Sequence, residues 1–108
     1  MGLSEYLRSR ERDYLNKKDV HASMIEKGGI VRHIEVRFEP NCGANEFQSI
    51  VGCIHDMSDG VLIVTSGPTE FEKGALSIKV KEHDYELDKR AAGTMQVLLD
   101  YLLPNLGK

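Results

Sequence analysis

The stretch Asp59-Gly60-Val61-Leu62-Ile63-Val64-Thr65-Ser66 decides how the rest of the chain can be arranged. Its five residues from Val61 to Thr65 are apolar or β-branched, with Asp-Gly before them and Ser-Gly-Pro after them. A short apolar run between turn-forming residues is typical of a strand that is buried on both faces. We therefore expect residues 61–65 to form the central strand of a small sheet, and we place the other segments by asking what covers it.

Two other segments alternate between apolar and polar residues, as strands with one wet face do. They span residues 30–39, which Pro40 ends, and residues 75–82. Their apolar faces consist of Ile30, Ile34, Val36 and Phe38 in the first segment and of Leu76, Ile78 and Val80 in the second. We expect the second segment to pair antiparallel with residues 61–65.

The N-terminal residues 3–26 contain neither Pro nor Gly, and Ser4 can cap a helix there. Gly28 and Gly29 follow Lys27, a pattern that can end a helix. The sequence thus predicts one helix over about residues 3–26. Because its apolar residues are sparse and its charges many, we expect this helix to pack loosely.

Residues 45–60 allow two interpretations. As a helix capped by Asn45, the segment aligns its apolar residues in one stripe, namely Phe47, Ile50, Val51, Ile54 and Met57. As a strand over residues 47–55 followed by a turn at 58–60, it divides that apolar set between two faces. We prefer the helix.

The last helix should begin after its N-cap Asp84 and end near Leu103, where Pro104 follows. Its main apolar stripe consists of Leu87, Ala91, Met95, Leu98 and Leu102. The whole chain, residues 1–108, is therefore predicted to be a single α+β domain in the order α-β-α-β-β-α. Its sheet should be small, mainly antiparallel and of about three strands.

The composition is ordinary for a globular protein, with 41% hydrophobic and 29% charged residues among 108. The net charge of −3 argues against broad binding to nucleic acids or to anionic membranes. No secretory signal and no apolar run long enough to span a bilayer is visible. With two cysteines and no disulfide framework, we expect a cytoplasmic protein with free thiols.

The sequence contains no catalytic signature and no complete set of metal ligands, so we favour a non-enzymatic role without deciding the question, and we expect no cofactor. The exception to test is Cys42, which lies in a loop before the helix expected from Asn45. The positive end of a helix dipole favours thiolate, so Cys42 is a candidate reactive thiol of an enzyme or redox protein. No base can be placed beside it from the sequence, and this is the weakest of our functional hypotheses.

A basic cluster in the N-terminal segment is the candidate contact for nucleic acid. It consists of Arg8, Arg10, Arg12, Lys17 and Lys18. Acidic residues interleave with it, and residues 1–27 carry six basic against five acidic side chains. We therefore rank a nucleic-acid-binding protein second and expect any such binding to be weak and dependent on salt.

The preferred hypothesis is a small binding or regulatory module that works as a homodimer and contacts another protein. The last helix carries more apolar residues than one core stripe needs, so a second surface must cover it. We expect that cover to be the same helix of a second copy, through Leu99, Tyr101 and Leu103. Phe71, in an otherwise polar loop, is a further candidate for a protein interface.

Overall fold

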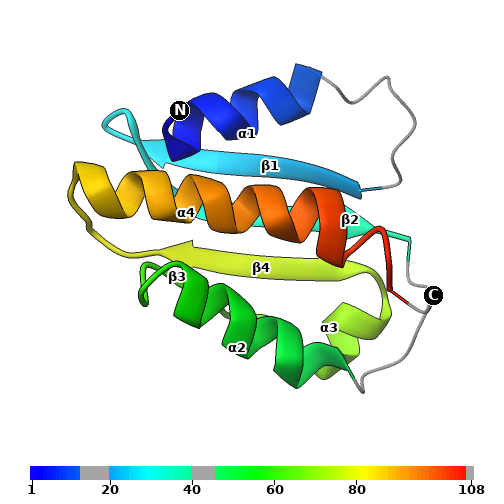
Figure 1. Cartoon of the computed structure of the whole chain (residues 1–108). Coiled ribbons are helices and arrows are strands. Elements are labelled where there is room, and N and C mark those ends of the chain that lie inside the picture. Colours follow the sequence, from blue (N-terminus) through cyan, green and yellow to red (C-terminus); the bar gives the residue numbers. More distant parts are fainter. Residues whose placement is uncertain (13–19, 40–45, 107–108) are drawn as a thin grey trace.

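The computed structural model describes residues 1–12, 20–39 and 46–106, and in it helices pack on an antiparallel sheet (Figure 1). In chain order the elements are α1 (Leu3–Arg12), β1 (Val20–Lys27), β2 (Ile30–Phe38), α2 (Phe47–Met57), β3 (Leu62–Val64), α3 (Pro68–Glu72), β4 (Ala75–Val80), α4 (Tyr85–Val97) and the π-helical turn η3 (Leu98–Leu102). The four strands lie in the order β1-β2-β4-β3, and every neighbouring pair is antiparallel. The α+β class is confirmed, with one strand more than expected.

The strand that was expected at the centre of the sheet lies at its edge. β3 pairs only with β4, as predicted, while β2 and β4 occupy the centre. Leu62 is fully buried, but Ile63 and Val64 are partly exposed. α2 packs on β3, so the apolar run reflects burial beneath a helix and not a position between two strands.

The N-terminal segment is not one helix. α1 ends at Arg12, and residues 20–27 form β1, which pairs with β2 in a hairpin. Lys27 faces Ile30 across a two-residue turn at Gly28 and Gly29, whose φ angles are +64° and +78°. Two positive φ angles match the turn that suits the twist of a hairpin, so the glycines reverse a strand and do not end a helix.

A bulge in β2 changes which of its first residues face the core. Ile25 pairs with His33 and Glu26 pairs with Val31, so Arg32 is an extra residue on β2. As a result Val31 is buried, whereas Ile30, which was expected on the core face, is 49% exposed.

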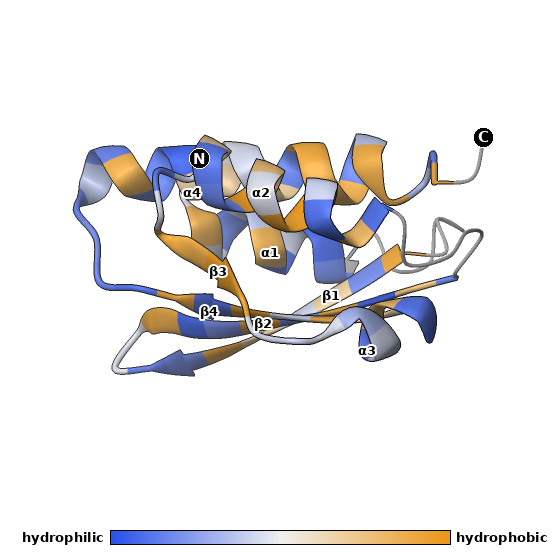
Figure 2. Ribbon diagram, turned by 90° about the horizontal axis from the view of Figure 1, so that it is seen from below, coloured by the Kyte–Doolittle hydropathy of each residue, from blue (hydrophilic) through white to orange (hydrophobic). Residues whose placement is uncertain are grey.

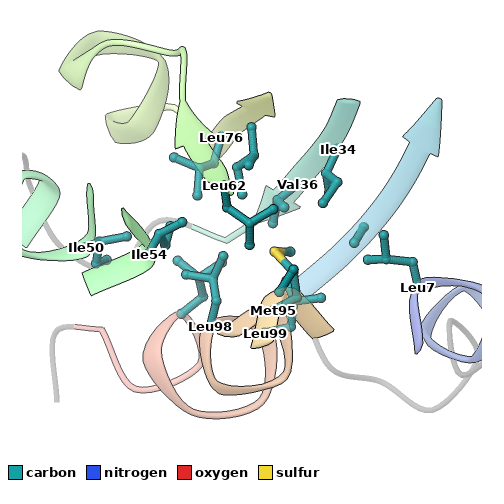
Figure 3. Close-up of a cluster of buried hydrophobic side chains, with 14 of the residues drawn as sticks. Leu7, Ile34, Val36, Ile50, Ile54, Leu62, Leu76, Met95, Leu98 and Leu99 are labelled. Carbon is teal, nitrogen blue, oxygen red and sulfur yellow. The ribbon is translucent and has the colours of Figure 1, made fainter. Parts of the chain in front are cut away.

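Helices α1, α2 and α4 form one layer on one face of the sheet (Figure 2). The core lies between this layer and the strands, where side chains from both layers meet (Figure 3). The opposite face of β1, β2 and β4 carries polar residues, among them the exposed Ser23, Glu35, Arg37 and Lys79.

Two of the predicted helices are confirmed. In α2, Phe47, Ile50 and Ile54 are buried and Val51 is partly buried, so the segment is a helix and not a hairpin strand; the expected cap Asn45 lies outside the described residues. The Asp84 side chain caps α4 by accepting a hydrogen bond from the Leu87 N–H at 2.9 Å.

Phe71 belongs to the core and is not available as an interface residue. It lies in the short helix α3 and is 1% exposed. Its ring centroid is 5.1 Å from that of Phe38 and 5.4 Å from that of Phe47. By packing on Phe47, the ring holds the segment between β3 and β4 against the start of α2.

Candidate functional site

An apolar groove lies between α2 and the C-terminal segment, with a volume of about 390 Å³. Its lining consists of Glu46, Ser49, Ile50 and Cys53 from the α2 side and Tyr101, Leu102, Asn105 and Leu106 from the other. Most of the lining surface is apolar, and the Tyr101 side chain at its rim is 64% exposed. An open apolar groove next to an exposed aromatic ring is the feature of this surface best suited to binding another molecule.

The π-helical turn η3 shapes one wall of this groove. The Leu103 N–H bonds to the Leu98 carbonyl, five residues back, at 2.9 Å. The wider turn brings Leu98, Leu99 and Leu103 all to the core and leaves Tyr101 outside. π-helical turns are frequently found at functional sites, which agrees with the position of the groove.

Leu99 and Leu103, which were expected at a dimer interface, are 0% and 2% exposed within the single chain. Within the chain, η3 contacts β1 as well as α4, and α1 packs beside it against α4 and β1 (Figure 1). Despite its many charges, α1 buries Leu3 and Leu7 fully and Tyr6 nearly so. Of the three helix residues expected at the interface, Tyr101 alone is at the surface of the single chain, and the homodimer itself stays a prediction.

Arg10 is the residue that holds η3 to α1. Its Nη1 lies 2.7 Å from Asp100 Oδ1, and its Nη2 donates to the carbonyls of Leu99 and Val20 at 3.3 and 3.4 Å. The same five-residue spacing would make residue 104 the donor for the Leu99 carbonyl, but residue 104 is a proline and has no N–H. The Arg10 guanidinium takes the place of that donor, and its side chain is 9% exposed.

The structure describes the side chains of two members of the predicted basic cluster, and each of them makes an ion pair. Arg10 is enclosed, and Arg8 Nη2 lies 2.7 Å from Glu26 Oε1 on β1. The side chain of Arg12 and the residues Lys17 and Lys18 lie outside the described residues.

The candidate thiol Cys42 also lies outside the described residues. The other cysteine, Cys53, is a half-buried free thiol on α2 in the wall of the groove. Its Sγ lies 3.4 Å from Met57 Sδ, one helical turn further along. A thioether is not a base, so this contact does not activate the thiol.

His83 and Asp88 form a close pair, but the geometry does not leave the histidine free as a general base. His83 Nε2 lies 2.7 Å from Asp88 Oδ1, and Nδ1 lies 2.7 Å from the Lys81 carbonyl. Both ring nitrogens thus face acceptors, and neither offers a lone pair to a substrate.

On the uncovered face of the sheet, the Glu35 carboxylate accepts a hydrogen bond from Ser77 Oγ at 2.9 Å and lies 2.7 Å from His33 Nε2. This arrangement joins β2 to β4 and lacks the serine–histidine contact of a nucleophilic triad. Within the described part of the chain, no three His, Cys, Asp or Glu side chains lie close enough together to hold a metal ion. No helix in the same residues is long and apolar enough to cross a membrane.

Sequence reasoning missed the groove, the role of Arg10 and the His83–Asp88 pair. The alternation of Val20, Ala22 and Met24 with polar residues was the signal that could have placed β1, and with it the cover over α4. No sequence signal could have paired Arg10 with the end of α4, because the two lie 90 residues apart. The chain matches no protein-family model, no curated protein and no solved structure.

Proposed function

We propose that this chain is a small, non-enzymatic binding or regulatory module that acts as a homodimer, with the groove beside Tyr101 as its interface. The observation that supports the proposal is the open apolar groove between α2 and the C-terminal segment, with an exposed tyrosine at its rim. A twofold interface needs one self-complementary patch, and a groove next to a projecting ring meets that need. The Tyr101 ring of each copy enters the groove of the other.

The chemistry of the groove fits a tyrosine better than a charged group. Ile50, Leu102 and Leu106 supply apolar contact, while Asn105 and Ser49 supply polar groups for a phenolic hydroxyl. Aromatic anchors that fill apolar pockets carry most of the binding free energy in protein interfaces. We also propose a cytoplasmic location, because the free Cys53 thiol fits a reducing compartment.

The experiment compares two exposed tyrosines. Tyr101 and Tyr85 are 64% and 71% exposed, but Tyr85 lies at the start of α4, away from the groove, where Lys89 Nζ is 4.6 Å from its ring centroid. Sedimentation or light scattering at tens of micromolar should show about twice the 12.1 kDa chain mass for the wild type and for Tyr85→Arg. Tyr101→Arg should run as a folded monomer, with dimer affinity reduced at least about 30-fold, as expected for an interface hot spot.

Two results would overturn the proposal. A wild type that is monomeric at this concentration would contradict the homodimer. A Tyr101→Arg variant that stays dimeric moves the interface away from the groove.

Two earlier hypotheses rank below the dimer. A nucleic-acid-binding role through α1 is less favoured, because Arg8 and Arg10 are held in ion pairs. A thiol chemistry at Cys42 stays a prediction, to be tested by labelling across pH in a Cys53→Ser background.

A further inference from the structure

The apolar residues at the end of the last helix fit two different windings of its final turn. In an α-helical register the core stripe runs from Leu98 to Leu102, as the sequence predicts. In the structure the π-helical turn η3 holds one residue more, so Leu103 is 2% exposed and Leu102 is only partly buried. Either register places a leucine on the core, so these side chains by themselves do not select one of the two.

The two registers differ in the donor that they give to the Leu99 carbonyl. In an α-helix this carbonyl accepts a hydrogen bond from the N–H of Leu103, four residues ahead. In η3 that N–H bonds to the Leu98 carbonyl at 2.9 Å, and residue 104, the next donor in line, is a proline without an N–H. Leu99 is 0% exposed, so water does not reach its carbonyl either. The π register therefore needs a donor from outside the helix.

Arg10 on α1 is that donor. Its Nη2 donates to the Leu99 carbonyl at 3.3 Å, and its Nη1 lies 2.7 Å from Asp100 Oδ1, so one guanidinium holds two neighbouring residues of η3. The bond to the carbonyl favours the π register, because in the α register the same carbonyl already has the Leu103 N–H. A buried acceptor without a donor is costly, whereas a second bond to a satisfied acceptor adds little. Removing the guanidinium should shift the equilibrium toward the α register at least about fivefold.

The register of η3 also decides the shape of the groove. One side of the groove lies entirely in η3 or after it and consists of Tyr101, Leu102, Asn105 and Leu106. Taking one residue out of the turn rotates everything that follows by about 100° relative to α4, the rotation per residue of an α-helix. The side that α2 contributes would stay in place. The groove described above thus belongs to the π register.

We propose that Arg10 is a positioning residue that holds η3 in the π register and so keeps the groove and Tyr101 in place. α1, which contributes no residue to the described lining of the groove, would then control that surface from behind. Where it concerns the dimer, the inference rests on the proposed function, because only a copy in the π register presents the groove and the Tyr101 ring together. An event that releases α1 should therefore also weaken the dimer.

NMR reads the register directly, whether or not the chain is a dimer. A scalar coupling across a hydrogen bond joins the amide nitrogen of Leu103 to the carbonyl carbon of its acceptor. In the wild type that carbon should belong to Leu98. In Arg10→Met it should belong to Leu99 in a measurable fraction of the molecules, because the α register gains population.

Two further variants complete the series, and circular dichroism establishes that each variant is folded. Arg8→Met is the matched control, because Arg8 lies on the same helix but pairs with Glu26 on β1, and it should keep the wild-type coupling. Arg10→Lys should be intermediate, because a lysine keeps a positive charge near Asp100 but cannot reach the carboxylate and the carbonyl at once.

Sedimentation of the same proteins tests the link to the dimer. Both copies must be in the π register to associate, so the dissociation constant of the dimer should rise as the inverse square of the fraction in that register, as measured by NMR. Arg8→Met should keep the wild-type constant.

The outcomes separate this inference from the proposed function. A wild-type coupling to Leu99, or an Arg10→Met variant that keeps the full coupling to Leu98, would overturn the role of Arg10. A changed register with an unchanged dissociation constant would overturn the link to the groove. A monomeric wild type would contradict the proposed homodimer, while the coupling would still decide whether Arg10 sets the register. If Arg10→Met does not fold, a full wild-type coupling in Arg10→Lys would overturn the inference.

Discussion

Replacing Arg10 by methionine should destabilise the fold far more than the same change at Arg8. Both arginines lie on α1, and each makes an ion pair at 2.7 Å. They differ in burial, because the Arg10 side chain is 9% exposed and the Arg8 side chain is 57% exposed. Methionine keeps most of the apolar stem of arginine, so the substitution isolates the guanidinium group.

The magnitude follows from what the Arg10 guanidinium contacts. A hydrogen bond that involves a charged group contributes about 1.5–3 kcal/mol, and breaking a buried ion pair costs about 3–5 kcal/mol. Asp100 is 22% exposed, and the bonds to Leu99 and Val20 are long, so the lower part of these ranges applies. We expect Arg10→Met to lower the free energy of unfolding by about 2–4 kcal/mol, out of a total of about 5–15 kcal/mol for a domain of this kind.

Arg8→Met should cost no more than about 1 kcal/mol, since exposed ion pairs contribute little. Arg10→Lys should fall between the two, because a lysine keeps the charge but cannot reach the carboxylate and a carbonyl at once. Urea unfolding followed by circular dichroism at one fixed protein concentration measures all three. Equal losses for Arg10→Met and Arg8→Met would refute the reasoning, and so would a fully stable Arg10→Met.

Three further outcomes are expected. Ile54→Ala should lower the free energy of unfolding by about 2–5 kcal/mol, against less than about 0.5 kcal/mol for the exposed Gln48→Ala on the same helix, as urea unfolding would show. Phe71→Ala should lower the free energy of unfolding by about 3–5 kcal/mol, because it leaves a cavity between the rings of Phe38 and Phe47. A variant of wild-type stability with a mobile β3–β4 loop would contradict this packing. In a Cys42→Ser background, thiol labelling of Cys53 should slow as the protein concentration rises through the dimerisation range, since this thiol lines the groove; a concentration-independent rate would place the contact elsewhere.

The parts of the fold that the sequence predicts correctly are those with strong local signals. The stripe from Phe47 to Ile54 identifies a helix because no strand register keeps those residues on one face. Asp84 is recognisable as a cap because its side chain bonds three residues ahead. The alternation in β4 is complete, with Leu76, Ile78 and Val80 all buried.

The errors arise where pairing or packing between elements decides the structure rather than local preference. Residues 20–27 contain no Pro or Gly, so nothing local ends the predicted helix there. Their pairing with β2 decides that they form a strand. The sequence does not show that Arg32 is a bulge, because a bulge is defined by how two strands pair. This bulge nevertheless sets which of Ile30 and Val31 is buried. The burial of Leu99 was missed because β1, which contacts η3, and Arg10, which donates to the Leu99 carbonyl, come from the other end of the chain.

The place of β4 in the sheet also sets the order in which the chain can fold. β4 lies between β2 and β3 although it follows both along the chain. The β1–β2 hairpin closes a loop of two residues and can form early, whereas joining Phe38 to Gly74 requires closing the whole intervening segment. On the ribosome, β3 has no strand to pair with until β4 has emerged, and the inner edge of β2 stays open for the same interval. Insertion of β4 is therefore the step that commits the chain to its native topology, and Leu76 and Ile78 are the positions where substitutions should slow folding rather than speed unfolding.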